Sequence, residues 1–196
     1  MRRLTGVALA LAVLAGGPAL ADPVGITRDR LEITVPLPEG GSAVIARIQD
    51  EDNQVTGDWA RTSRACPPFC IQPMQPAPGV TTIGELELLA MLEDPEAVVV
   101  DGRVRRDFEG GSIPGAISIP YTEAADRLDE LGCEIDFDGF DCDNARRVAL
   151  FCNGPWCGQS PTAARRMIEA GYPAERIFYY RGGMQVWRML GLTVTE

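Results

Sequence analysis

The sequence predicts an α/β fold, with a parallel sheet flanked by helices on both faces and a small β-rich N-terminal extension. Stretches of helical spacing alternate with four short apolar runs: 98–101, 116–120, 148–151 and 176–180. Short strands that are apolar throughout are typical of a parallel sheet covered on both sides. Several prolines between 72 and 79 interrupt regular structure before this pattern begins. We therefore expect one α/β domain at 79–196, preceded by an extension and Pro-rich linker at 22–78.

The extension contains two runs of strand-like composition. These runs, 31–35 and 43–48, are separated by the turn-forming stretch 36–41. An isolated hairpin is barely stable in water, so we expect this hairpin to pack against the α/β domain.

Four segments of the α/β domain carry helix signals. Thr81 or Thr82 is placed to cap the first, whose apolar positions recur at helical spacing as far as Leu92. The second covers 121–131 and the fourth covers 184–190. In the third, we expect Ser160 to be the N-cap and Pro161 to take the first helical position, where proline is tolerated.

Residues 1–21 have the features of a secretory signal peptide. Two arginines precede an uncharged, mostly apolar run from 4 to 15, and Ala19 and Ala21 form a small-x-small cleavage site. No later segment is apolar for long enough to cross a membrane. We expect cleavage before Asp22 and a periplasmic location.

The mature chain would be strongly acidic. Its 16 arginines stand against 28 acidic residues, which leaves a charge of −12, and the sequence contains neither histidine nor lysine. This charge argues against nucleic acid and anionic membranes as partners. The missing histidines exclude a Cys–His or Ser–His catalytic pair and most zinc or haem ligand sets.

All six cysteines lie in the mature chain, where an oxidising compartment favours disulfides. Cys133 and Cys142 bracket an acidic, Gly-containing loop and are expected to staple it. Cys66 and Cys70 flank a Pro-Pro-Phe stretch, and a disulfide there is favoured over a Cu(I) site that includes Met74. The last local pair of cysteines is at positions 152 and 157.

Cys152 stands where an apolar strand ends, at the start of a Gly-containing loop that leads into the helix at Ser160. Ligands of parallel sheets bind beyond the carboxyl ends of the strands. The backbone N–H groups of such a loop, together with the dipole of the following helix, favour a negatively charged sulfur. Cys152 is therefore the candidate nucleophile.

The chain from about 79 to 195 resembles a rhodanese (sulfurtransferase) domain. Five motifs of that family occur in its order: the strand ending in Asp101-Gly102-Arg103, the run Gly111-Ser112-Ile113-Pro114-Gly115-Ala116 with serine in place of histidine, Cys152, Gly171-Tyr172, and Gly182-Gly183-Met184-Gln185-Val186-Trp187.

The resemblance implies transfer of sulfane sulfur without a metal or organic cofactor. Cys152 would take sulfur from thiosulfate, a polysulfide or a protein persulfide, and a thiol acceptor would remove it. Asp101 and Arg103 are expected to orient strand and loop, and Arg103 is also a candidate for binding substrate. The other candidate substrate-binding residues line the loop: Asn153, Gly154, Pro155, Trp156, Gly158, Gln159 and Ser160.

The loop departs from the family pattern in two ways. It is about two residues longer, and Cys157 and Gln159 fall near the position of the usual arginine. Cys157 is therefore a second candidate catalytic residue, as a resolving or regulatory thiol. Two alternatives stay open: disulfide exchange through Cys152 and Cys157, with a periplasmic protein as partner, or a silent binding module in which these thiols form a permanent disulfide.

Overall fold

The structure is a computed structural model that describes residues 22–137 and 139–195. The predicted signal peptide lies outside the described residues. A parallel sheet of five strands forms the centre, in the order β3-β9-β8-β4-β5. Its strands are β3 (Thr81–Ile83), β4 (Ala97–Asp101), β5 (Ile117–Ser118), β8 (Arg147–Phe151) and β9 (Ile177–Tyr180). The predicted parallel sheet is confirmed.

Alternate residues of the strands are buried on opposite faces of the sheet. On one face, Val100 and Leu150 pack against α3 (Gln159–Glu169). On the other, Val99 and Phe151 pack against α1 (Glu85–Glu93) and α4 (Gly183–Met189). Burial on both faces explains why the central strands are apolar throughout, because each residue faces one of the two cores.

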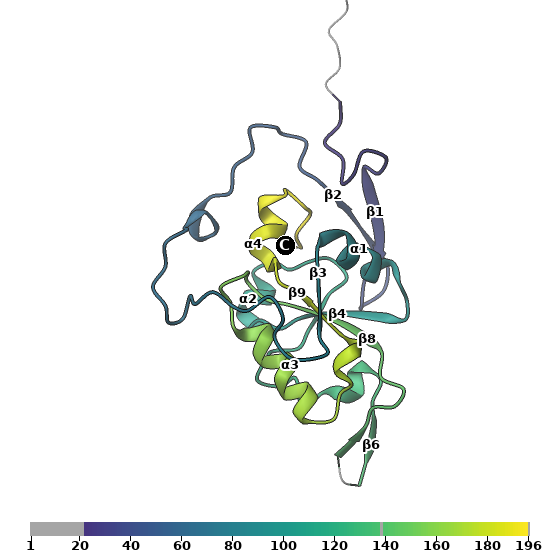
Figure 1. Cartoon of the computed structure of the whole chain (residues 1–196). Helices are drawn as coiled ribbons and strands as arrows, with labels where there is room; N and C mark the ends of the chain where they lie inside the picture. Colours follow the sequence, from purple (N-terminus) through teal and green to yellow (C-terminus); the bar gives the residue numbers. More distant parts are fainter. Residues whose placement is uncertain (1–21, 138, 196) are drawn as a thin grey trace, which may run out of the picture.

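The extension forms the predicted antiparallel hairpin of β1 (Glu32–Pro36) and β2 (Ser42–Ala46). Ile33, Val35 and Ile45 are buried in the same core as α1 and α4. Beyond β2, a long segment with one short turn of helix, η1 (Gly57–Ala60), runs out past α4 and returns to the sheet at β3 (Figure 1). No helix within 22–137 or 139–195 is long and apolar enough to span a membrane.

The helix predicted to begin at Thr81 or Thr82 begins later, and the prediction is wrong for its first residues. These β-branched residues form strand β3 instead and pair with Phe178 and Tyr179 of β9. The helix begins at Glu85, and the Glu87 carboxylate accepts a hydrogen bond from the Gly84 N–H at 3.0 Å. The long-range pairing to β9 outweighs the local capping signal.

The helix predicted over 121–131 is also wrong, because only η2 (Leu128–Leu131) is helical there. Arg127 donates to the Ser118 carbonyl at 3.1 Å and forms ion pairs with Glu123 and Glu130. These contacts hold a series of turns and override helix propensity. A short helix that the sequence did not predict, α2 (Arg105–Glu109), precedes β5.

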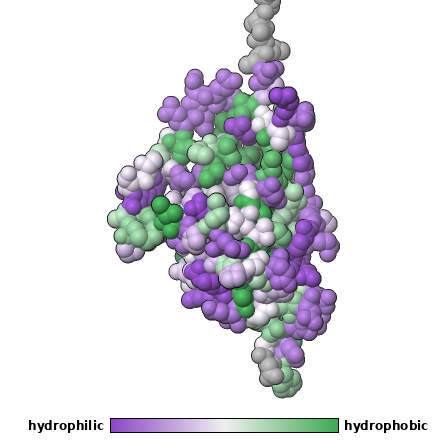
Figure 2. All heavy atoms as spheres, in the orientation of Figure 1, coloured by the Kyte–Doolittle hydropathy of each residue, from purple (hydrophilic) through white to green (hydrophobic). Residues whose placement is uncertain are grey.

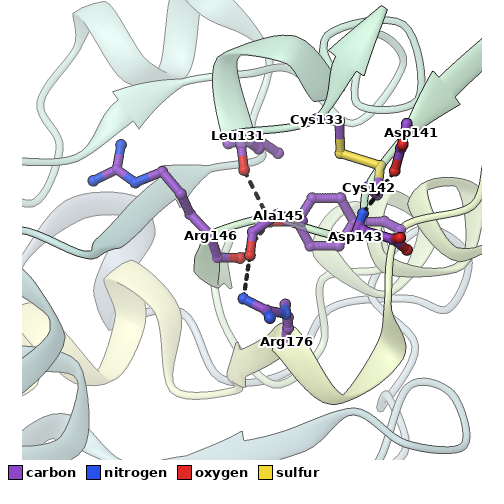
Figure 3. Close-up of a disulfide and its surroundings, with 9 residues drawn as sticks. Leu131, Cys133, Asp141, Cys142, Asp143, Ala145, Arg146 and Arg176 are labelled. Atoms are coloured by element: carbon purple, nitrogen blue, oxygen red, sulfur yellow. Dashed lines mark hydrogen bonds between the residues drawn. A yellow bond between two sulfur atoms is a disulfide. The ribbon is translucent and has the colours of Figure 1, made fainter. Parts of the chain in front are cut away.

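Cys133 and Cys142 form a disulfide at the base of a small hairpin of β6 (Glu134–Asp136) and β7 (Gly139–Asp141) (Figure 3). Both cysteines are buried. Next to them, the Arg176 guanidinium donates to the Ala145 carbonyl. The acidic loop is thus stapled to the domain, as its spacing predicted.

Candidate functional site

The loop that begins at Cys152 connects β8 to α3 at the carboxyl end of the sheet. The first turn of α4 holds this loop from the side. The Met184 N–H donates to the Cys152 carbonyl at 3.0 Å, and the Gln185 N–H donates to the Asn153 carbonyl at 2.9 Å. Gly183 has a positive φ of 53°, and a Cβ there would lie 2.7 Å from the Gly154 nitrogen. Only glycine allows α4 to approach the loop this closely.

The helix after the loop begins earlier than the sequence predicted. Gly158 is its N-cap and Gln159 its first residue, so Ser160 lies inside the first turn rather than at the cap. Pro161 occupies the third position, where its missing N–H is still one of the unpaired donors of the first turn. The longer helix brings the N–H groups at its start close to the loop sulfurs.

Cys152 and Cys157 are both unpaired and buried. Only Cys157 of the two lies among the residues that the described structure places on the wall of a neighbouring cleft. The Cys152 thiol donates to the Cys157 carbonyl at 3.3 Å. The Cys157 sulfur has Gln159 Oε1 at 3.4 Å and Asn153 Nδ2 at 4.0 Å. The outer sulfur of the pair is therefore Cys157.

The pKa values of the two thiols are shifted in opposite directions. The pKa of Cys157 is lowered from 9.0 to about 7, chiefly by hydrogen bonding from the Cys152 thiol, and further by the backbone N–H groups of Gln159 and Asn153. The pKa of Cys152 is raised, chiefly by burial and then by the neighbouring Cys157. The thiol that ionises near neutral pH is thus the one facing the cleft.

The expectation that the loop favours a charged sulfur at Cys152 stays a prediction, because Ser160 and burial act on this thiol in opposite directions. Ser160 lowers the pKa of Cys152 through its backbone and side chain, but burial outweighs it. The backbone N–H and the hydroxyl of Ser160 are therefore placed to donate to a sulfur at position 152 that becomes negative during a reaction.

The lowered pKa gives a pH dependence with a definite sign. The thiolate of Cys157 is the reactive form, so the rate of its alkylation should rise as pH increases through about 7 and level off above it. Replacing Cys152 by alanine removes the hydrogen bond that lowers this pKa most, so the midpoint should move upward. Iodoacetamide kinetics across pH, read by mass analysis, would measure both. A wild-type midpoint near that of an ordinary cysteine would contradict this account.

The cleft beside Cys157 has a volume of about 740 Å³. Of the loop residues predicted to bind substrate, Asn153, Trp156, Gly158 and Gln159 line it. Gly154, Pro155 and Ser160 are not among its lining residues in the described structure. The Pro155 carbonyl instead accepts a hydrogen bond from the Gln72 N–H at 2.8 Å.

The extension supplies part of the cleft wall, which the sequence did not predict. The contributing residues include Trp59, Arg64, Pro68 and Phe69. The Cys66–Cys70 disulfide encloses Pro68 and Phe69, and it leaves neither thiol free for a copper ion. The sequence does show a cation and an aromatic residue, Arg64 and Phe69, close to the Cys66–Cys70 pair. No local pattern indicates that they lie against the loop that begins at Cys152.

Asp101 and Arg103 form a buried ion pair, with Nη2 and Oδ2 2.6 Å apart. Arg103 Nε also donates to Asp101, and Nη2 donates to the Gly111 carbonyl at 2.8 Å. The Ser112 hydroxyl donates to Asp101 Oδ2 at 2.7 Å. Arg103 lines the cleft, but Nε and both hydrogens of Nη2 are engaged by the protein. The Arg103 side chain is therefore better placed to fix the carboxyl end of β4 than to bind substrate.

This chain is similar over part of its length to several known proteins. It is 37% identical over 114 residues to an HTH-type transcriptional regulator of Mycobacterium tuberculosis, a match that covers 58% of this chain and 44% of the regulator. It is 31% identical over 98 residues to a tRNA uridine(34) hydroxylase of Erwinia tasmaniensis, covering 50% and 25% of the two chains. The chain therefore spans less than half the length of these curated relatives.

Solved structures of similar domains include a rhodanese-like domain from Anabaena. It is 21% identical, with 50% of this chain and 98% of that one covered and a TM-score of 0.39. A thiosulfate sulfurtransferase from Pseudomonas aeruginosa is 26% identical, with 60% and 20% covered and a TM-score of 0.45. The family model of the rhodanese-like domain matches residues 85–190, which is more than half of the 196 residues. The chain belongs to the rhodanese-like domain family.

Proposed function

We propose that this protein is a sulfurtransferase whose reactive group is the thiol pair of Cys152 and Cys157. The observation that supports it best is the position of Cys157. Its sulfur lies beside the cleft with a pKa of about 7, next to a second, buried thiol, in the loop between β8 and α3 of a rhodanese-like domain. A thiolate at neutral pH is the form that attacks sulfane sulfur.

In the first step, the Cys157 thiolate attacks the outer sulfur of a donor such as thiosulfate. A new S–S bond forms at Cys157, the S–S bond of thiosulfate breaks, and sulfite leaves with the electron pair. The charge passes to the terminal sulfur of the persulfide. The N–H groups of Asn153 and Gln159, which lower the pKa of Cys157, are placed to stabilise this negative charge.

Two fates follow for the persulfide. A thiolate acceptor can attack its outer sulfur, which returns Cys157 to the thiolate and leaves the acceptor persulfidated. Alternatively, Cys152 attacks the inner sulfur, so that a Cys152–Cys157 disulfide forms and the outer sulfur leaves as hydrogen sulfide. In the second route the transferred sulfur is reduced and the thiol pair is oxidised, so a dithiol reductant must restore it.

The expected setting for this chemistry is the periplasm, on the basis of the predicted signal peptide. In that compartment an exported thiol protein is the acceptor class of the first route, and an exported dithiol protein is the reductant class of the second. A small sulfur anion or a protein persulfide is the expected donor. We propose no metal or organic cofactor, because thiol and persulfide chemistry supplies every step.

Disulfide exchange with a partner protein is the second candidate function. The contact between the Cys152 thiol and the carbonyl of Cys157 supports it, since it places the thiols in one compact loop. The third candidate, a silent binding module, requires these two cysteines to form a permanent disulfide. The three candidates differ in which sulfur species the thiols accept.

Formation of thiocyanate from thiosulfate and cyanide tests the proposal. The wild-type protein should turn over, and the Cys152→Ser/Cys157→Ser double variant should fall to background. Turnover with protein disulfides but with no sulfane donor would favour disulfide exchange instead. If Cys152 and Cys157 cannot be alkylated after treatment with a reductant as strong as thioredoxin, the result would favour the silent module. Equal activity of the double variant and wild type would reject the assignment.

A further inference from the structure

A segment of the N-terminal extension forms part of the wall of the cleft. Gln72 donates to the Pro155 carbonyl of the loop at 2.8 Å, and Arg181 donates to the Gln72 carbonyl at 3.0 Å. Gln185 of α4 donates to the Trp59 carbonyl. The segment is therefore fixed to the loop and to α4 at several points, including both sides of its Cys66–Cys70 disulfide. Figure 2 shows apolar side chains gathered on the lobe at the left, where Figure 1 places this segment.

Arg64 is held at the cleft by two aromatic rings, one from the extension and one from the loop. Its guanidinium carbon lies 4.7 Å from the ring centre of Phe69 and 5.1 Å from that of Trp156. The two rings are themselves 4.7 Å apart, centre to centre. Stacking on aromatic faces fixes a guanidinium without consuming its N–H donors.

The Arg64 side chain retains unused hydrogen-bonding capacity. Its Nη2 donates to the Asp58 carbonyl. Its Nε atom is buried and has no partner in the described structure. No carboxylate of the described residues forms an ion pair with Arg64. The guanidinium therefore has hydrogen-bonding capacity that the described residues do not use.

The other arginines of the cleft are already engaged. Arg103 is paired with Asp101 inside the domain, and Arg106 is paired with Asp107 at 3.1 Å. Of the three arginines that line the cleft in the described structure, Arg64 alone has no ion pair. The loop from Cys152 to Ser160 has no cation of its own.

We propose that Arg64 binds the anionic part of the sulfur donor and so replaces the cation that the loop lacks. This inference rests on the proposed sulfurtransferase function and names its substrate class as a sulfur oxyanion with a terminal sulfane sulfur, such as thiosulfate. The sulfonate oxygens accept hydrogen bonds from Arg64, while the sulfane sulfur faces Cys157. The extension thereby completes the binding site of the α/β domain.

Thiosulfate binding to a chemically inert protein tests the inference without any turnover. The full chain with Cys152→Ser and Cys157→Ser is titrated with thiosulfate by calorimetry, with and without Arg64→Gln. The Arg64→Gln change should weaken binding roughly 10-fold, because a charge-assisted contact is lost. Arg64→Lys should restore part of the affinity, since it keeps the charge without the planar stacking. The matched control is Arg61→Gln, an exposed neighbour paired with Asp58, which should leave binding within about two-fold.

Steady-state kinetics of the Arg64→Gln variant with intact cysteines add a second readout. The KM for thiosulfate should rise more than kcat falls, and the KM for a neutral organic trisulfide should change less. Unchanged thiosulfate affinity in Arg64→Gln, or an equal loss in Arg61→Gln, would overturn the inference. Thiosulfate binding that depends on Arg64 in a protein with no sulfur transfer would reject the proposed reaction and leave the binding site standing.

Discussion

Replacing Cys157 by serine should lower the rate of sulfite release from thiosulfate by roughly 10³-fold or more, because the attacking thiolate is removed. Cys157 borders the cleft and has a pKa of about 7, whereas Cys152 is not among the lining residues of the cleft and has a raised pKa. The measurement is the first turnover of thiosulfate, followed by sulfite detection under conditions where the enzyme is in excess.

The matched control is Cys152→Ser, which keeps the outer thiol. Its first turnover should retain most of the wild-type rate at pH values above the midpoint of Cys157, while steps that need the second thiol should fail. A first turnover that is lost in Cys152→Ser and kept in Cys157→Ser would assign the attack to the buried sulfur. Circular dichroism of both variants excludes a folding defect as the cause.

Replacing Arg103 by methionine should lower the free energy of unfolding by about 3–5 kcal/mol, because Asp101 would keep a buried charge without its partner. Both side chains are almost completely buried, at 0% and 2% exposed, and the same carboxylate also accepts the Ser112 hydroxyl. Urea denaturation with the disulfides intact gives the free energy of unfolding. The expected loss corresponds to a fall of roughly 10 °C in Tm.

A second substitution distinguishes an unpaired charge from simple loss of packing. The double variant Asp101→Asn/Arg103→Met removes both charges and keeps an acceptor for Ser112. It should recover a large part of the lost stability, since neutral replacement of a buried pair is far less costly than breaking it. Equal destabilisation of the single and double variants would show that the ion pair contributes little to holding the β4 end.

The elements that the sequence predicted well are those whose signals are local. The apolar run 148–151 and the cysteine after it required only a buried strand followed by glycines, and β8 ends at Phe151. Residues 81–83 were misassigned because their strand conformation depends on pairing with β9, almost a hundred residues later. The turns after Pro120 depend on contacts of the Arg127 side chain, which no helix signal reveals.

The same distinction between local and long-range signals applies to the candidate site. Spacing predicted the loop, its two thiols and the Cys133–Cys142 staple. It could not predict which thiol faces the cleft, because that depends on how the turn closes through the Cys157 N–H and the Gly154 carbonyl. Nor could it place Arg64, whose contact with Trp156 joins the extension to the loop across the folded molecule.

Intact-mass analysis of the Cys152→Ser variant after exposure to thiosulfate tests the central claim most directly. The claim is that the outer thiol, Cys157, receives the first sulfur. We predict a gain of one sulfur atom in this variant, removed by an added thiol and absent from Cys157→Ser. A gain that appears in Cys157→Ser and not in Cys152→Ser would contradict it.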